Sequence, residues 1–204
     1  MPRPKQRTDA MRGRVLASAM DLLERDGVAA FTARRVAGTA GTSTSSVYEL
    51  FGDKGGLLRA LYFDGFAQLR QCLGALDETG AAPAQLLELI RAYRSFITAH
   101  PILSDLMFSC PFTDFDPTAS EREASGSVRE YIVDVVRRGI AEGVVGGDAT
   151  DVAHVLVALV QGMAAAENAR RLGTTRESID RRWELAIDAC MSGLSALPRQ
   201  LQPS

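Results

Sequence analysis

Helical periodicity is the feature of this 204-residue sequence that most limits its fold. In residues 8–25, apolar side chains recur at spacings of three and four and form one broad stripe, which is typical of an amphipathic helix. The same spacing returns in the later segments, and no convincing run alternates apolar and polar residues as a half-buried strand would. The sequence therefore predicts an all-α fold.

Turn and capping residues divide the first predicted helices from one another. Gly27 is expected to end the first helix, and Gly41 to end a short second helix that Thr32 caps. Ser43 and Asp53 are expected to cap the next two helices. The first of these is short, whereas the second is long enough to join two domains.

Further along the chain, two helix starts carry the spacing of a capping box. These are Ser120 with Glu123, and Thr174 with Glu177. A proline-bounded loop is expected over residues 109–117. The predicted helices span residues 8–25, 32–40, 44–51, 54–76, 83–99, 101–108, 120–142, 150–172 and 175–197.

The composition is that of an ordinary globular protein, with 46% apolar and 24% charged residues. A net charge of −2 excludes a uniformly basic nucleic-acid binder, but the charge is unevenly distributed. The first 56 residues carry nine basic and six acidic side chains, whereas the remainder carries fourteen basic and nineteen acidic ones. A polyanion-binding surface is therefore expected near the N-terminus.

The sequence gives no sign of export, membrane insertion or a metal site. No apolar stretch directly follows the basic start, so we expect a cytosolic protein. The most apolar run, residues 152–166, is shorter than the ~20 residues of a membrane span. The cysteines are odd in number, widely spaced and without CxxC pairs, which argues against a disulfide framework or a zinc site. Buried thiols are favoured over a redox sensor, and no metal or cofactor is expected. They are Cys72, Cys110 and Cys190.

Residues 32–51 have the pattern of a helix-turn-helix, whose second helix can enter the major groove of DNA. Gly41 lies in the turn, where a positive φ is needed, and Ala37 and Ala40 are small enough for the two helices to pack closely. Three apolar side chains are expected to hold the pair against the first helix: Val36, Val47 and Phe51.

Residues 31–58 resemble the signature of the tetracycline-repressor (TetR) family, with Thr, Arg, Val-Ala, Ala-Gly, Ser, Tyr, Phe and Lys at matching positions. Beyond residue 76 the likeness is one of layout. The resemblance implies a helix-turn-helix DNA-binding domain in residues 1–55 and a helical effector-binding and dimerisation domain in residues 56–204. It also implies a transcriptional regulator, more commonly a repressor than an activator.

The family's DNA contacts map onto hydroxyl and basic residues of this chain. Thr32 and Ser43 lie at helix N-termini, which bind phosphate well, and Tyr48 and Lys54 are expected to reach phosphates too. Alternatively, the Ser/Thr cluster only caps helices, and the basic N-terminal arm is a solvated tail. The predicted DNA-binding residues are Thr32, Arg34, Ser43, Thr44, Ser45, Ser46, Tyr48 and Lys54, with Arg3, Lys5 and Arg7 in the arm.

The chain departs from the family pattern at Ser45, Leu50 and Gly55, where Gly, His or Tyr, and Glu are usual. The predicted recognition helix also has no Arg, Lys, Asn or Gln, the residues that make bidentate base contacts. Specificity is therefore expected to depend on DNA shape, on the arm and on Arg34.

The last two predicted helices are expected to form half of a four-helix interface with a second copy of the chain. Residues 152–160 are apolar nearly all round, and the resemblance implies the same interface. Burial within a single chain is the alternative. The predicted interface residues are Leu156, Leu159, Val160, Ile179, Trp183, Ala186, Cys190 and Leu197.

The resemblance also implies an effector pocket, here lined by aromatic side chains with few polar groups. The ligand is expected to move residues 65–66 of the long helix, and Lys54 with them. Each aromatic could instead be ordinary core, and His100 a helix-end cation. The predicted lining is Phe66, Leu69, Tyr93, Phe96, His100, Met107, Phe108, Phe112, Tyr131, Gln161 and Glu167.

Two other function classes fit less well. An enzyme is not expected, because the chain has two histidines and no ExxH pair, Gly-rich phosphate loop or nucleophile elbow. A helical adaptor that binds only proteins would leave the phosphate-ready Thr32, Tyr48 and Lys54 without a role. A DNA-binding regulator accounts for all three.

Overall fold

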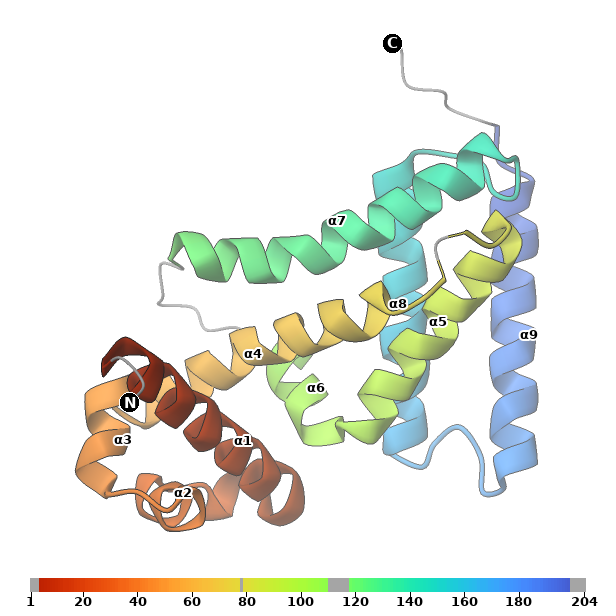
Figure 1. The fold of residues 1–204 in the computed structure, drawn as a ribbon. Helices are drawn as coiled ribbons and strands as arrows, with labels where there is room; N and C mark the ends of the chain where they lie inside the picture. The colour runs from red at the N-terminus through yellow and green to blue at the C-terminus, as the bar shows by residue number, and fades with distance from the viewer. Residues whose placement is uncertain (1–3, 78, 110–117, 199–204) are drawn as a thin grey trace. The chain divides into compact units, whose positions relative to one another are not determined.

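The structure is a computed structural model that describes residues 4–77, 79–109 and 118–198. Within these ranges the regular secondary structure is helical throughout, which confirms the all-α prediction (Figure 1). The helices are α1 (Pro4–Ala30), α2 (Ala33–Ala40), α3 (Thr44–Phe51), α4 (Lys54–Gly74), α5 (Ala82–Ala99), α6 (Pro101–Ser109), α7 (Ala119–Ala141), α8 (Ala149–Asn168) and α9 (Arg176–Ser195).

The predicted stops and caps of the first helices are confirmed. Gly27 breaks the helical path of α1 with a φ of 74°, and Gly41 follows α2 with a φ of 63°. Thr32 and Ser43 are the N-caps of α2 and α3. Asp53 accepts a hydrogen bond from the backbone N–H of Gly56 through Oδ1, at 2.8 Å, in the first turn of α4.

Both predicted capping boxes were wrong, because neighbouring residues form the box instead. At α7, Thr118 and Glu121 bond to each other's backbone N–H groups, so the box begins two residues before the predicted Ser120. At α9, Thr175 pairs with Ser178 rather than Thr174 with Glu177. Thr118 and Thr175 both have an extended backbone conformation. This conformation lets the hydroxyl accept a hydrogen bond from the backbone N–H three residues later in the chain.

Helix α8 also ends four residues earlier than predicted. It ends at Asn168, and two residues later Arg170 takes a left-handed φ of 56°, which cannot continue an α-helix. The apolar periodicity that predicted a longer helix continues to Leu172, so the sequence pattern did not reveal this turn.

The chain forms two compact units. The first, the head unit, combines the chain up to Phe66 with the segment from His100 that carries α6; the second unit contains the remainder. The boundary therefore lies within α4, further along the chain than the predicted 55/56, and α6 belongs with the head. The head core contains buried side chains from α1 to α4, among them Val15, Leu22, Leu23, Phe31, Val36, Val47, Phe51, Leu57 and Leu61.

Within the head unit, a carboxylate of α1 caps the N-terminus of α6. Glu24 of α1 accepts hydrogen bonds from the backbone N–H groups of Ile102, at 3.3 Å, and Leu103, at 2.9 Å, the orphan donors at the start of α6. On α4, a Cβ at Gly65 would lie 2.5 Å from the sulfur of Met107, so glycine allows α4 and α6 to approach closely. Helix α6 thus closes one side of the head core.

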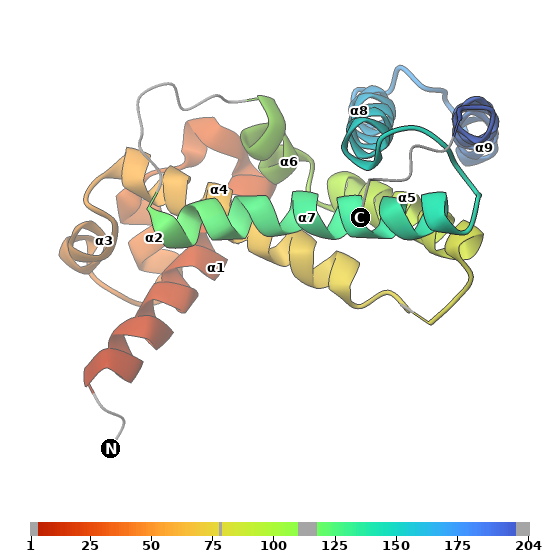
Figure 2. The ribbon, with the colours of Figure 1, turned by 90° about the horizontal axis from the view of Figure 1, so that it is seen from above.

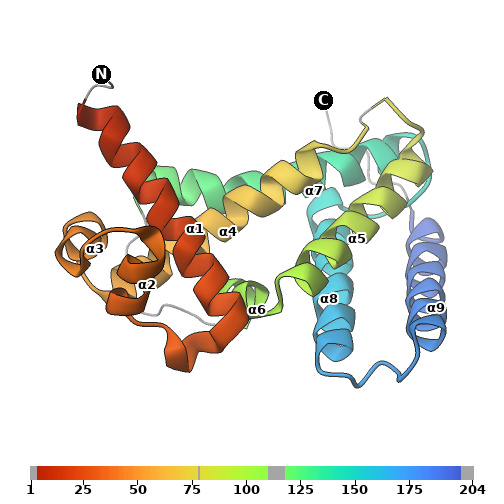
Figure 3. The same ribbon diagram turned by 60° about the horizontal axis from the view of Figure 1, so that its bottom comes forward.

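In the second unit, α5, α7 and α8 pack against one another, and α9 packs on α8. Helices α8 and α9 run side by side in opposite directions, joined by a short loop (Figures 2 and 3). The fully or nearly fully buried side chains of this core include Leu69, Leu73, Leu86, Ile90, Val135, Val136, Val152, Leu156, Val160 and Trp183.

By length and composition, one described helix is apolar enough to cross a membrane. This is α8, which at 20 residues is longer than the apolar run recognised in the sequence, although only 28% of its most apolar 18-residue window is buried. A core helix of a soluble protein meets the same criterion, so length and composition alone do not make α8 a membrane span. The low burial of α8 shows that part of its apolar surface is exposed to solvent in the single chain.

Candidate functional site

Three serine hydroxyls form a cluster at the N-terminus of α3. Ser43 Oγ accepts a hydrogen bond from the backbone N–H of Ser46 at 3.0 Å, and it lies 2.8 Å from both Ser45 Oγ and Ser46 Oγ. These three residues are called the hydroxyl cluster below. Unpaired backbone N–H groups and the positive end of the helix dipole also meet at a helix N-terminus, which together with hydroxyls makes a good phosphate site.

Other predicted DNA contacts are also at the surface of the head unit. Tyr48 exposes 48% of its surface one turn along α3, although large aromatic side chains are usually buried. Thr32 caps α2 from an exposed position, accepting from the backbone N–H of Arg35 at 3.3 Å. Lys54 is the exposed first residue of α4, and Thr44 is partly exposed. All four can meet a ligand without unpacking the core.

The two neighbouring arginines of α2 differ in their surroundings. Arg35 is anchored to the end of α1, with Asp26 at 2.6 Å and the Ala30 carbonyl oxygen at 3.3 Å. Hydrogen bonding from Arg25, assisted by Arg35, holds the pKa of Asp26 below its ordinary value. Arg34 is exposed. Arg34 is therefore the better placed of the two for a phosphate.

Arg12 is a residue of this surface that the sequence analysis missed. Its guanidinium lies 4.6 Å from the centre of the Phe51 ring and donates a hydrogen bond to the Leu50 carbonyl oxygen at 3.4 Å. These contacts place a cation at the C-terminal end of α3, which the helix dipole favours. Arg12 is 38 positions from Leu50, so no local sequence pattern signals the contact.

The predicted N-terminal arm is largely a helix instead. Helix α1 begins at Pro4, so the backbones of Lys5 and Arg7 lie in its first turns rather than in an extended tail. The helical periodicity was recognised only from residue 8, because the preceding residues are polar. Arg3 lies outside the described residues.

In the second unit, two residues of the predicted effector pocket are hydrogen-bonded to each other. The side-chain amide of Gln161 on α8 donates a hydrogen bond to the Tyr93 hydroxyl on α5 at 3.0 Å. Burial raises the pKa of Tyr93 to about 12, although the bond from Gln161 acts in the opposite direction. The phenol is therefore neutral at physiological pH.

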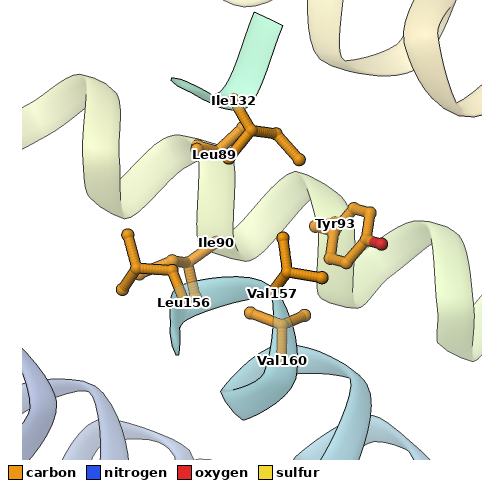
Figure 4. Close-up of a pocket in the computed structure, with 7 residues that line it drawn as sticks. All are labelled: Leu89, Ile90, Tyr93, Ile132, Leu156, Val157 and Val160. Atoms are coloured by element: carbon orange, nitrogen blue, oxygen red, sulfur yellow. The ribbon is translucent and has the colours of Figure 1, made fainter. Parts of the chain in front are cut away.

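A small apolar cavity adjoins this pair (Figure 4). Its volume is about 10 Å³, room for about one water molecule. Tyr93 is the only member of the predicted pocket in its lining, because the other positions are aliphatic side chains of three helices. The lining residues are Leu89, Ile90, Tyr93, Ile132, Leu156, Val157 and Val160.

The other predicted pocket residues are divided between the two units. In the head unit, Phe66 and Phe108 meet edge to face with ring centres 6.0 Å apart, and Met107 packs at Gly65. His100 begins the same segment, where its carbonyl oxygen accepts from Ser104. In the second unit Leu69 and Phe96 are buried. Tyr131 of the predicted pocket stacks with Arg70, whose guanidinium carbon lies 4.3 Å from the centre of the Tyr131 ring. Phe112 lies outside the described residues.

Glu167 belongs to an ion cluster rather than to an apolar pocket. Arg94 on α5 donates two hydrogen bonds to Glu167 on α8, at 2.9 and 3.0 Å, and one to Asp180 on α9, at 2.8 Å. The indole N–H of Trp183 donates to Glu167 at 2.7 Å, and the guanidinium lies 4.7 Å from a Trp183 ring centre. These four residues are called the Arg94 cluster below.

The electrostatics of the Arg94 cluster follow from this geometry. Burial alone would lower the pKa of Arg94, but the hydrogen bonds to Glu167 and Asp180 outweigh it and raise the pKa. The hydrogen bond from Arg94 holds the pKa of Asp180 below its ordinary value. Arg94 and Asp180 are therefore both charged near neutral pH.

Three of the eight predicted interface residues are buried within the single chain. Leu156, Val160 and Trp183 each expose only 2% of their surface, so they are core residues of the single chain. Ile179, Ala186, Cys190 and Leu159 are partly exposed, and Leu197 is exposed. Other exposed small or apolar residues form a stripe on α8 and a patch on α9: Val155, Ala158, Gly162, Ala165, Leu185 and Ala189.

Two sequence families match the chain. Residues 86–190 match "Tetracyclin repressor-like, C-terminal domain", and residues 15–61 match "Bacterial regulatory proteins, tetR family". The first match alone covers more than half of the chain. The chain belongs to the TetR family. It is therefore a TetR-family transcriptional regulator with a helix-turn-helix DNA-binding region, which confirms the resemblance recognised in the sequence.

Solved structures share the TetR fold of this chain. A protein with unknown function from Rhodococcus sp. RHA1 is 30% identical, with a TM-score of 0.75 over 91% of this chain and 95% of that one. A TetR variant from Acinetobacter baumannii AYE in complex with minocycline is 20% identical, with a TM-score of 0.64 over 89% and 94%. BioQ with its natural double-stranded DNA operator is 23% identical, with a TM-score of 0.58 over 89% and 98%. No curated protein matched the sequence.

Proposed function

We propose that this TetR-family regulator is a repressor that binds a palindromic operator as a homodimer and is released by a small apolar or aromatic effector. The observation that carries the proposal is the surface of α3. The hydroxyl cluster, the exposed Tyr48 and the basic residues Arg34 and Lys54 provide hydrogen-bond donors and positive charge on one unit. Hydroxyls, phenols and cations are the groups that hold DNA phosphates.

In this proposal α3 is the recognition helix. Its N-terminal end offers short hydroxyls, which can contact base edges or a thymine methyl, but it has no side chain for bidentate base recognition. Phosphate contacts then provide most of the affinity, and DNA shape contributes strongly to specificity.

Homodimerisation is supported by the exposed apolar surface of α8 and α9. Val155 exposes 47% and Leu185 69% of its surface, and Val155 continues along α8 into the exposed Ala158, Gly162 and Ala165, so the apolar surface is a contiguous stripe rather than a single residue. Ala158 and Gly162 would allow a second helix to pack closely against α8. A two-fold dimer would place two α3 helices about 34 Å apart, one turn of DNA.

Effector release is supported by the character of the second unit's core. The cavity at Tyr93 is apolar with one hydroxyl nearby, which suits an apolar or aromatic molecule that makes one or two hydrogen bonds. Since the cavity is small, such a ligand would require a more open conformation. It would then favour that conformation by its binding free energy, and the ligand-free protein would be the form that holds DNA.

Footprinting on genomic DNA fragments tests the proposal directly. A protected palindrome with half-sites about one helical turn apart is expected. Binding should weaken steeply with salt and persist against competitor DNA. Protein that protects no site under these conditions would instead support a helical adaptor.

Tyr48→Phe provides a sharper test of the surface itself. Removing the phenolic hydroxyl should weaken binding to all operator sequences about equally, because a phosphate contact carries no base information. Tyr131→Phe, the same change at a buried phenol of the second unit, is the control, and once shown to be folded and dimeric it should bind the operator as tightly as the wild type. Unchanged affinity of the Tyr48 variant would show that this phenol does not contact DNA.

A further inference from the structure

Helix α9 is held to the rest of the second unit mainly at two points. Among its described residues, only Trp183 and Leu194 are buried. They are eleven positions apart, about three helical turns, and therefore lie on the same face at a separation of about 16 Å. The side chains between them on this face, Ala186, Ile187 and Cys190, are only partly buried.

The attachment near the end of α9 is made by the backbone. Gly146, in the loop before α8, donates its N–H to the Leu194 carbonyl oxygen at 2.8 Å, and Gly147 donates to the Pro198 carbonyl oxygen at 2.9 Å. A Cβ at Gly146 would lie 2.0 Å from the Leu197 carbonyl oxygen, so glycine is required there. This attachment fixes where α9 ends.

The other attachment is the Arg94 cluster, which joins three helices through one guanidinium. The side chains of Arg94 and Glu167 are only 16% and 9% exposed, so their ion pair is shielded from water. Arg94 also bonds Asp180 and lies over the Trp183 ring, and both of these residues are on α9. A planar guanidinium fixes such contacts in direction as well as in distance.

We propose that Arg94 is a positioning residue for the homodimer, because it sets α9 beside α8 so that their exposed apolar residues form one continuous face for a second copy of the chain. The inference rests on the proposed homodimer. Between Trp183 and Leu194 the side chains of α9 are only partly buried, so the attachments at these two positions, together with the ion pair of Arg176 to Glu167, set the angle between α8 and α9. Of these, only the Arg94 cluster connects α9 to both α5 and α8.

The test is Arg94→Met in the 204-residue chain, which keeps an unbranched apolar stem and removes the guanidinium. The dimer dissociation constant, measured by sedimentation, is expected to rise about tenfold or more, because Asp180 loses its bond to α5 and Glu167 keeps only Trp183 and the exposed Arg176 as partners on α9. Trp183 is the sole tryptophan of the sequence, so its fluorescence reports on the cluster directly. Arg91→Met, an exposed arginine one turn away on α5, is the matched control.

The possible results separate the inference from the proposed function. A changed Trp183 fluorescence with an unchanged dimer dissociation constant would overturn the positioning role and leave the homodimer intact. A wild-type protein that is monomeric at all concentrations would overturn the homodimer and, with it, the positioning role.

A conservative variant covers the case in which Arg94→Met does not fold. Arg94→Lys keeps the charge but cannot make the paired contacts, so its dissociation constant is expected to lie above that of the wild type and its fluorescence to change. An Arg94→Lys variant that dimerises as tightly as the wild type while its fluorescence changes would refute the proposal.

Discussion

The two units of this regulator use polar groups in opposite ways. In the head unit, the hydroxyl cluster, Tyr48 and Arg34 are at the surface, and the packed core beneath them is almost entirely apolar. In the second unit, the surface of α8 offers apolar side chains, and polar groups such as Tyr93 and the Arg94–Glu167 ion pair lie inside. Substitutions on the head surface should therefore change binding with little effect on stability. Substitutions inside the second unit should change stability or assembly first.

The largest effect is expected from Gly162→Glu on α8. A Cβ at Gly162 meets nothing within 4 Å in the single chain, so the fold tolerates the change, but a charged side chain would disrupt close packing of a second copy. The protein should become monomeric in sedimentation, and operator affinity should fall ~100-fold or more as two linked contacts become one. Gly162→Ala, with a small side chain, should remain dimeric. A dimeric Glu variant would mean that this stripe is not the interface.

The next largest effect on operator affinity is expected at Arg34, and its neighbour Arg35 on α2 should behave differently. Arg34→Ala should reduce operator affinity about tenfold at low salt and lower the slope of log affinity against log salt by about one, because one phosphate contact is lost. Its thermal stability should not change. Arg35→Ala should instead lower the melting temperature slightly and leave operator affinity unchanged, since an exposed ion pair to Asp26 is lost. The reverse pattern would exchange the roles of the two residues.

A smaller effect is expected from Arg12→Met, which removes the cation near the end of α3. Operator affinity should fall about fivefold, roughly 1 kcal/mol, and equally for all sequences, because Arg12 supports α3 rather than reading bases. Gel shifts with two unrelated operator variants measure this directly. Sequence-dependent losses would indicate that Arg12 contacts DNA bases.

The smallest effect concerns the buried phenol of Tyr93. Its folded pKa of about 12 exceeds the unfolded value of 10, so its contribution to stability is complete below pH 10 and is lost as pH rises toward 12. Tyr93→Phe should lose about 1 kcal/mol at neutral pH and show a shallower decline in stability between pH 10 and 12. Thermal melts across this range provide the measurement. Tyr62→Phe, at a less buried phenol, should change the alkaline decline less.

The sequence predicted local features of the head well. The caps Thr32 and Ser43 and the turn at Gly41 depend on residues within four positions of one another, so their spacing is visible in the chain. The N-cap hydroxyls that stabilise α2 and α3 are also the ones expected to meet DNA.

The second unit was less predictable, because its decisive contacts are distant in sequence. Tyr93 and Gln161 are 68 positions apart, and Arg94 and Asp180 are 86 apart. Periodicity identified apolar faces on α8 and α9 but could not show which face the chain buries itself. Trp183 was consequently assigned to a partner, whereas it lies in the core of its own chain.

The capping of α6 by Glu24 has a consequence for exchanging parts between relatives. A DNA-binding module cut after residue 55 or residue 66 would leave behind the helix that covers part of its apolar core, including Ile102 and Leu106. Chimaeras that change operator preference should therefore carry residues 100–109 together with the N-terminal segment. Fusing the N-terminal segment alone would place Glu24 and the exposed apolar core against a helix of the other protein, which has not been selected to pack against them.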